Sequence, residues 1–536
     1  MQQTAPDHAR ERYRLVSRAD EVVSVLDNGA TVIAKRVASP VVAVRAYVRT
    51  GGAFEGPWLG GGLSHLLEHL VAGGSTDRRT EAENRNLLQQ IGNNSNAYTS
   101  DDQTAYFINT TSPHYEQAID LVTGWLLGAK ITPDEYAREY QVVQRELEMG
   151  KGDPDRQFYY LANANRYRVS PARVPVIGYQ EVIQGLGRDD VYAYYKLAYQ
   201  PQNMVFSVAG DVDPEAMLAA FKTHLAAAKP GRGFDRDLPA EPAVVTPRTV
   251  VATFPKLGQA KVQVAFPTIR LDSPDLYALD LLSAVLSAGD SAVLTEDLRD
   301  KRQLVSSVTS YSHTPDYVEG TFAVAFECDP DKVQAATDAA RAVLRSARET
   351  LVDADRLARA KTQMRVARVR GLQTAEEIAS SLANDYLTTG DPHFTDTYLD
   401  RVEQVTPEQV RAVAQRYLAD ERLLTTVMLP AETAPRGLPQ AVDLVRPAAP
   451  TTAPAGEAAQ GPAGVVRTQL DDGTVLLVKR ITASPLVAVR MYAFGGVTAE
   501  DAGNNGIGHL TMEMLTRGTA DRGTTDRPDA RPSRGG

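Results

Sequence analysis

The chain has 536 residues and a mass of 58.1 kDa, with 43% hydrophobic and 23% charged residues, so a globular protein of more than one domain is expected. The net charge of −10 and the lack of a basic cluster argue against nucleic-acid binding, and no run of eighteen apolar residues indicates a membrane span. The single cysteine, Cys328, excludes an intrachain disulfide and a cysteine metal site, and it is expected to be buried.

The first segment, residues 1–19, is predicted to be an N-terminal extension. It is polar and lacks the apolar core of a signal peptide. Taken at face value this favours the cytoplasm. A periplasmic or secreted protein whose signal peptide had been removed would begin in the same way, so both compartments stay open.

A short helix is predicted over residues 63–72, between glycines on both sides. It contains His65-Leu66-Leu67-Glu68-His69, the pattern H-x-x-E-H, which is the inverse of the H-E-x-x-H motif of zinc peptidases. His65 and His69 lie one turn apart on one helix face, so both can bind one metal ion. Glu68 shares that face and can take a proton from a metal-bound water. The alternative is a surface helix with two solvated histidines, but only eight histidines occur in the chain.

A second helix is predicted over residues 133–149, where a proline and an acidic pair suit the first turn. Its apolar stripe consists of Tyr136, Tyr140, Val143 and Leu147. Glu139 and Glu146 are two turns apart on another face. Glutamates on a helix usually form a solvated face. A catalytic zinc site, however, needs a third protein ligand besides two histidines and a water.

These features together resemble the pitrilysin family of zinc metallopeptidases, which includes insulin-degrading enzyme and the mitochondrial processing peptidase. In that family a glutamate on a later helix is the third ligand, and Glu146 stands at the matching spacing from His69. The resemblance implies one Zn²⁺ per chain, bound by His65, His69 and Glu146, with Glu139 contacting the ligands from outside the coordination sphere. Glu148 is the alternative ligand, but a rotation of about 200° from Glu146 on the helix should turn it away.

Residues 92–100 resemble the strand with which this family pairs an extended peptide substrate. Asn96 and Ala97 are therefore predicted to bind substrate. Such an edge strand holds a peptide by its backbone, whatever its side chains. An ordinary hairpin is the alternative, since the composition is that of a strand. The resemblance implies a peptide or unfolded polypeptide as substrate, and it allows a second homologous half or subunit as a partner.

The expected fold class is α+β. Residues 20–230 are predicted to form the zinc-binding peptidase domain, and residues 245–430 a second α/β domain of the same half. Helices are predicted in this second domain over residues 277–286, 330–349 and 407–418. In the family, each half consists of two such similar domains, with helices packed on a mainly antiparallel sheet.

One stretch of the second domain departs from the family pattern. Two-half relatives use an arginine and a tyrosine, seven residues apart in the second half, to grip the substrate or its oxyanion. In the first half of this chain Arg299 matches the arginine, but Ser306 replaces the tyrosine. Arg299 is thus a predicted substrate-binding residue, and its partner is missing from this half.

The last part of the chain begins with residues 431–463, which are rich in alanine and proline and are predicted to be a semi-rigid linker. Residues 464–525 repeat the start of the first domain, and His65 returns there as His509. Met512 and Glu513 stand opposite the glutamate and the second histidine of the motif, so this copy is degenerate. The last residues, 526–536, lack apolar periodicity and are predicted to be disordered.

A two-half family member that is truncated early in its second half, with a partial third domain, would explain this repeat. Three functions then compete. The first is a zinc-dependent endopeptidase that hydrolyses peptides by a metal-bound water, with Glu68 as general base. The second is a non-catalytic interaction subunit, which would have no need of an intact set of ligands. The third is a weak or inactive truncated family member that binds zinc without turnover.

Overall fold

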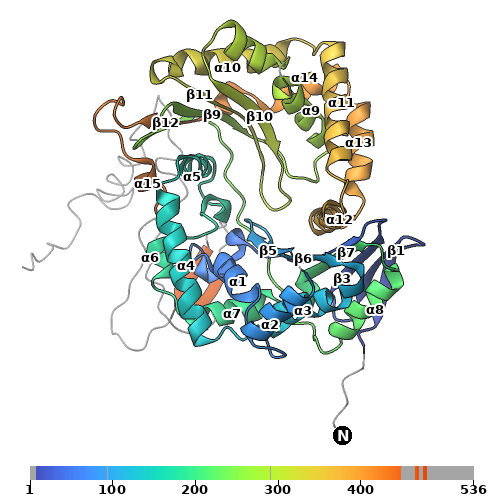
Figure 1. The fold of residues 1–536 in the computed structure, drawn as a ribbon. Coiled ribbons are helices and arrows are strands. Elements are labelled where there is room, and N and C mark those ends of the chain that lie inside the picture. The colour runs from blue at the N-terminus through green and yellow to red at the C-terminus, as the bar shows by residue number, and fades with distance from the viewer. Residues whose placement is uncertain (1–7, 93, 290, 448–464, 470–474, 480–536) are drawn as a thin grey trace, which may run out of the picture. The chain divides into compact units, whose positions relative to one another are not determined.

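A computed structural model describes residues 8–92, 94–289, 291–447, 465–469 and 475–479 of the chain (Figure 1). The chain divides into two compact units, Met1–Thr451 and Thr452–Gly536. The larger unit contains two sheets with helices packed on them, which confirms the predicted α+β class. Within the described ranges, none of the helices combines the length and the apolarity that crossing a bilayer requires.

The first sheet has seven strands in the order β1-β2-β3-β7-β4-β6-β5. They are β1 (Glu11–Arg18), β2 (Glu21–Leu26), β3 (Thr31–Arg36), β4 (Val41–Val48), β5 (Asn94–Thr99), β6 (Thr104–Thr111) and β7 (Met204–Gly210). Neighbouring strands are antiparallel except β3 and β7, which are parallel. Strand β1 lies within the range predicted as an N-terminal extension. Its side chains are mostly polar and exposed, so no apolar alternation marked it as a strand.

The two faces of this sheet are covered by different helices. The helices that follow in sequence are α1 (Leu63–Val71), α2 (Glu81–Gln90), α3 (Tyr115–Gly128), α4 (Pro133–Lys151), α5 (Pro154–Arg166), α6 (Gln180–Ile183), α7 (Arg188–Ala198) and α8 (Pro214–His224). Successive strand residues point to opposite faces. Val32 therefore enters the core formed with α1, α3, α7 and α8, whereas its neighbour Ile33 packs on the other face against Leu382 and Leu387 of α12 (Ala375–Thr389).

The second sheet has five strands in the order β10-β11-β9-β12-β8. They are β8 (Arg248–Phe254), β9 (Ala260–Pro267), β10 (Ser307–His313), β11 (Thr321–Cys328) and β12 (Leu424–Pro430). Only β12 and β8 pair in parallel. The remaining helices of this region are α9 (Leu276–Ser287), α10 (Val333–Glu349), α11 (Ala354–Arg370), α13 (Phe394–Gln404), α14 (Pro407–Tyr417) and α15 (Ala441–Leu444). Cys328 is buried in the core under these helices, as predicted.

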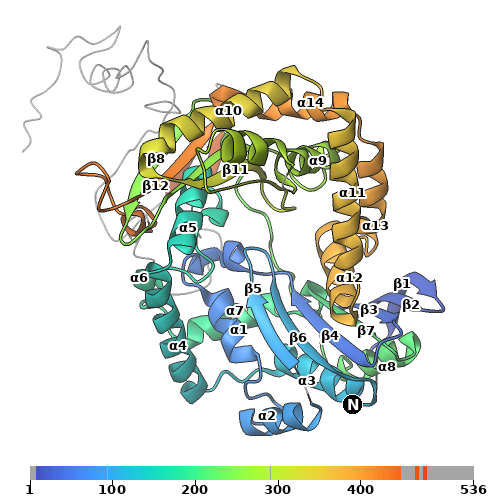
Figure 2. The same cartoon turned by 45° about the horizontal axis from the view of Figure 1, so that its top comes forward.

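Each sheet is also covered by a helix from the other part of the larger unit. Helix α12 belongs in sequence to the second sheet but lies on the first, next to β4 and β7 (Figures 1 and 2). Helix α5 follows the first-sheet helices but packs on the second sheet, where Leu161 contacts Ala252 and Met428. This exchange joins the two layers, and it places α5 between α4 and the second sheet.

The segment after the second sheet is only partly described. Residues 431–447, at the start of the range predicted as a linker, pack on the second sheet through α15, whose Ala441 is fully buried. Residues 448–463 lie outside the described ranges. In the smaller unit, β13 (Val465–Gln469) and β14 (Val475–Lys479) form an antiparallel pair. The rest of the predicted repeat, with His509, and the tail 526–536 lie outside the described residues as well.

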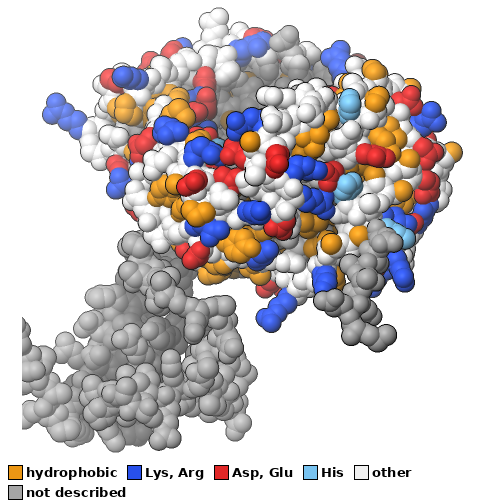
Figure 3. Space-filling model, turned by 60° about the horizontal axis from the view of Figure 1, so that its bottom comes forward, with side chains coloured by type: hydrophobic (Ala, Val, Ile, Leu, Met, Phe, Trp, Pro, Cys, Tyr) orange, Lys and Arg blue, Asp and Glu red, His pale blue; other side chains and the backbone are white. Residues whose placement is uncertain are grey.

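The surface carries charges of both signs. On the face that Figure 3 shows, Lys and Arg side chains are interspersed with Asp and Glu side chains. No continuous basic patch is visible among the described residues of that face. Although the net charge of the chain is −10, positive and negative side chains are mixed on this face and do not form separate regions.

Candidate metal centre

Helix α1 has an apolar face and a polar face. Leu63, Leu66, Leu67 and Leu70 are buried in the core beneath the first sheet. His65 and Glu68 are half-buried on the opposite side, together with His69. This division follows from the helical repeat, which interleaves the two sets of positions. The leucines fix the helix on the sheet, and they thereby fix the direction of the motif.

The start of α1 is held by groups that lie outside the motif. Gly62 has a φ of 65°, and a Cβ there would lie 2.2 Å from the carbonyl oxygen of Ile177, so only glycine fits. The buried carboxyl of Glu55 accepts hydrogen bonds from the amides of Gly62 and Ser64, at 3.0 and 2.8 Å. Burial raises the pKa of Glu55 to about 8, although both amides favour its charged form. Glu55 thus satisfies two of the free amides at this helix end.

The structure brings His65, His69 and Glu146 together. One possible ligand atom from each lies within 4.8 Å of the others. Glu146 Oε2 is 3.6 Å from His65 Nε2 and 3.7 Å from His69 Nε2. Ligand atoms at about 2.1 Å from a tetrahedral zinc lie about 3.4 Å apart, so these two separations exceed that spacing by only a few tenths of an ångström. The donor set, two imidazoles and one carboxylate, is one that zinc prefers.

His65 is also in a suitable protonation state. Burial, followed by the neighbouring His69 and Arg156, lowers the pKa of His65 to about 3. The ring is therefore neutral, and the neutral form of imidazole is the one that binds metals. The residues present fit a zinc ion in both chemistry and spacing.

The second wall of the centre is helix α4. Thr132 and Glu135 form a capping box at its start. Glu139 Oε2 lies 3.4 Å from His69 Nδ1, whereas the other ring nitrogen, Nε2, is the one 3.7 Å from Glu146. Glu148 instead forms an ion pair with Lys151, at 2.5 Å between Oε1 and Nζ. The helical rotation between the glutamates thus gives Glu146 and Glu148 different surroundings.

Replacing Glu139 with glutamine should weaken zinc binding by about 10–100-fold, which is the usual cost of losing a group that supports a ligand histidine. The reason is that the carboxylate at His69 Nδ1 both orients the ring and makes its other nitrogen more basic. Competition titration with a chromophoric chelator would measure the affinity. An unchanged affinity would mean that the 3.4 Å contact has no role in metal binding.

The proposed base, Glu68, is held by a strand residue. Its Oε2 accepts a hydrogen bond of 2.7 Å from Thr99 Oγ1, at the end of β5. Burial raises the pKa of Glu68, and the bond from Thr99 and the charge of His69 oppose this rise. The sequence contained a signal for this contact, because alternation along the strand places Thr99 on the same side as Ala97. Thr99 is nevertheless not among the site residues that the sequence predicted.

Two cavities border the metal group on different sides. One, of about 300 Å³, is lined by Glu68 and His69 together with Asn96 and Ala97. The other, of about 470 Å³, is lined by His65 and Glu146 and by side chains of α5. Asn96 and Ala97, which the sequence predicted as substrate-binding residues, therefore lie beside the motif.

Arg299 is not brought to this group. It lies on the π-helix Thr295–Lys301, in the layer of the second sheet, where its Nε donates to Asp300 Oδ1 at 2.8 Å. It lines neither of the two cavities that border the metal group. Within the larger unit, the structure therefore gives no support to a role for Arg299 in binding substrate at this centre.

Two family models match the chain. Residues 31–178 match the model described as insulinase (peptidase family M16), and residues 185–364 match the peptidase M16 inactive domain. The chain belongs to peptidase family M16. This confirms the resemblance seen in the sequence, since the H-x-x-E-H motif and Glu146 both lie within the matched insulinase region.

Several M16 relatives are similar over most of their length. The chain is 27% identical over 392 residues to an uncharacterized zinc protease of Streptomyces coelicolor, with 71% of this chain and 83% of that protein covered. It is 25% identical over 438 residues to a probable mitochondrial-processing peptidase subunit beta of Arabidopsis thaliana, with 78% and 80% covered.

Solved structures share the M16 fold. A protease from Helicobacter pylori superposes with a TM-score of 0.71 at 24% identity, over 77% of this chain and 100% of that chain. The periplasmic protease PqqL from Escherichia coli superposes with a TM-score of 0.65 at 17% identity. That match covers 80% of this chain but 47% of PqqL. The two-sheet architecture of the larger unit is thus that of known M16 proteins.

Proposed function

We propose that the chain is a zinc-dependent endopeptidase in which Glu68 is the general base. The observation that carries the proposal is the grouping of His65, His69 and Glu146, with Glu68 on the same face of α1. Membership of a peptidase family, and relatives that are named zinc proteases, support it.

The side chains around the centre have distinct roles in this proposal. Zinc, when bound by the three ligands, would supply a Lewis acid that polarises the peptide carbonyl and makes water more acidic. Glu68 takes a proton from the attacking water and gives it to the leaving nitrogen. Burial raises the pKa of Glu68, which is the direction that makes the carboxylate a stronger proton acceptor. Thr99 keeps the carboxylate in place through its hydrogen bond.

The position of β5 favours an extended peptide as substrate. It is the last strand of the first sheet, and its outer edge pairs with no strand in the described part of the chain. An extended peptide can add to such an edge by backbone hydrogen bonds. Because Thr99 belongs to β5 and also contacts Glu68, a peptide along this edge would pass the metal group. Asn96 and Ala97, in the middle of β5, would lie beside its backbone.

A non-catalytic interaction subunit is the second candidate. Residues 185–364 match the model of an inactive domain, and a chain of the complex III2 of Candida albicans superposes with a TM-score of 0.65 at 16% identity. A scaffold, however, has no need for three ligands at a zinc-like spacing and a carboxylate held beside them. This difference favours the peptidase.

Removing the metal is the direct test. We expect the purified chain to bind about one zinc, as three protein ligands predict, and to cleave a long unstructured peptide at internal bonds. Chelation and dialysis should abolish cleavage, and added zinc should restore it. Elemental analysis and mass spectrometry of the products would measure both. Zinc binding without cleavage would favour an inactive family member, and failure to bind zinc would favour the interaction subunit.

A further inference from the structure

The guanidinium of Arg156 is a charge without a partner beside the metal centre. Arg156 lies in the first turn of α5 and is exposed. Within the described residues its guanidinium makes no hydrogen bond and no ion pair. It rests against Gly150 of α4, where an added Cβ would lie 2.9 Å from Arg156 Nη1. Gly150 follows Glu146 by one helical turn, about 6 Å along the axis, so the positive charge lies one turn from the metal ligand.

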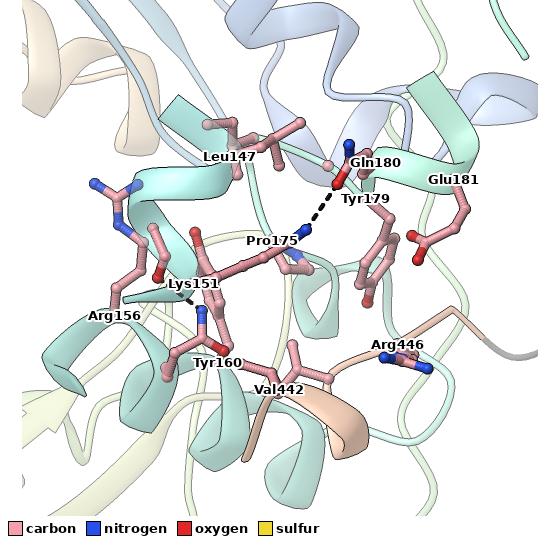
Figure 4. A pocket seen from close by; sticks show the side chains of 15 residues that line it. Leu147, Lys151, Arg156, Tyr160, Pro175, Tyr179, Gln180, Glu181, Val442 and Arg446 are labelled. Atoms are coloured by element: carbon pink, nitrogen blue, oxygen red, sulfur yellow. Dashed lines mark hydrogen bonds between the residues drawn. The ribbon is translucent and has the colours of Figure 1, made fainter. Parts of the chain in front are cut away.

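Arg156 lines the cavity of about 470 Å³ that His65 and Glu146 also line. The neighbouring cation Lys151 does not line it. Lys151 is bonded to Glu148 and to Gln180, and Figure 4 shows it pointing toward Gln180 while Arg156 points away. Arg156 lines the cavity of Figure 4 as well, whereas Lys151 lines only that one, so Arg156 is the cation of this pair that also reaches the cavity beside the metal group.

Each carboxylate that lines this cavity has another partner, and that of Glu146 is the metal group itself, where Oε2 faces His65 and His69. Asp155 forms an ion pair of 2.7 Å with Lys261. Asp101 accepts a hydrogen bond of 3.2 Å from Tyr317, and burial raises its pKa to about 7. The other arginine of the cavity, Arg173, donates to a backbone carbonyl at 2.7 Å, which leaves its charge without a carboxylate. The cavity thus holds two guanidinium charges that the described side chains do not balance.

We propose that Arg156 binds a carboxylate of the substrate, next to the scissile bond on the His65 side. The inference rests on the proposed function, in which a peptide runs along β5 past the metal group. A guanidinium forms bidentate, charge-assisted hydrogen bonds with a carboxylate, and this chemistry is shared by an acidic side chain and by a peptide C-terminus. The substrates preferred by this chain are accordingly peptides with an acidic residue, or a free C-terminus, at that position.

The test measures binding and does not depend on turnover. Fluorescently labelled peptides with Glu or Gln at one central position are titrated onto the zinc-loaded Glu68→Gln variant. A second pair has Gln at that position and a free or an amidated C-terminus. We expect the Glu peptide, the free-acid peptide or both to bind about tenfold more tightly than the neutral counterpart. The pair that shows the preference identifies the source of the carboxylate.

Two further variants locate the preference. Arg156→Gln should bind acidic and neutral peptides equally, while Lys151→Gln, which removes a nearby charge outside the cavity, should keep the preference. Arg156→Lys should retain part of it, and zinc content reports folding in each protein. Equal binding of all peptides, a preference that survives Arg156→Gln, or one that is lost equally in Lys151→Gln would overturn the proposal. If the wild-type protein cleaves no peptide but the preference for carboxylate-bearing peptides is still measured, the peptidase function is wrong and the carboxylate site stands.

Discussion

Replacing Glu68 with glutamine is expected to lower peptide hydrolysis by about 10²–10⁴-fold, the usual range for a lost general base, while the zinc content stays unchanged. Glutamine has the shape of glutamate, and its amide oxygen can still accept the hydrogen bond from Thr99. It cannot take up a proton, so only the proton transfer is removed. Parallel measurements of kcat/KM and of zinc by elemental analysis separate the two effects.

The comparison that sharpens this test is with Thr99→Val, which removes the hydroxyl donor while keeping the base. Its hydrolysis should fall by less than that of Glu68→Gln, because the carboxylate is present but less well placed. If Glu68→Gln lost zinc as completely as His65→Ala, Glu68 would be a ligand. The roles assigned within the motif would then be wrong.

The local parts of the site could be predicted from the sequence because they depend on spacing along one helix. The helical repeat puts the motif residues of α1 on one face, and likewise Glu139 and Glu146 of α4. The roles of the two glutamates are implied by the family resemblance, because spacing alone predicts only a solvated face. Predicted helices 277–286 and 407–418 match α9 and α14 to within a residue at each end. The helix predicted to begin at Pro330 begins instead as a 3₁₀ turn, Pro330–Lys332, before α10.

The parts that could not be predicted depend on contacts between residues far apart in the chain. Glu55 supports α1 from a loop, and no spacing rule connects such a loop carboxylate to a helix start. Which sheet α5 and α12 each pack on is decided by tertiary contacts, and the sequence of neither helix specifies it alone. Arg156 reaches the metal side only because Gly150 leaves room for it. These contacts, and not the motif by itself, determine what surrounds the centre.

Glu146→Gln should release zinc, whereas Glu148→Gln should keep it. The two glutamates form a matched pair, since they lie on the same helix two positions apart. Glu146 Oε2 faces both histidines at 3.6 and 3.7 Å, but the Glu148 side chain is 57% exposed and is paired with Lys151. Losing a ligand should cost more than the roughly 10–100-fold in affinity that a supporting group costs.

Zinc titration against a competing chelator would measure both variants, with His69→Ala as the reference for a lost ligand. Thermal unfolding gives an independent reading, because a metal that binds only the folded chain raises its melting temperature. Zinc should therefore stabilise wild type and Glu148→Gln but not Glu146→Gln. Equal zinc affinities in the two glutamate variants would remove Glu146 from the ligand set. The two histidines would then need a different third ligand, although Glu146 is the described carboxylate that the structure groups with them.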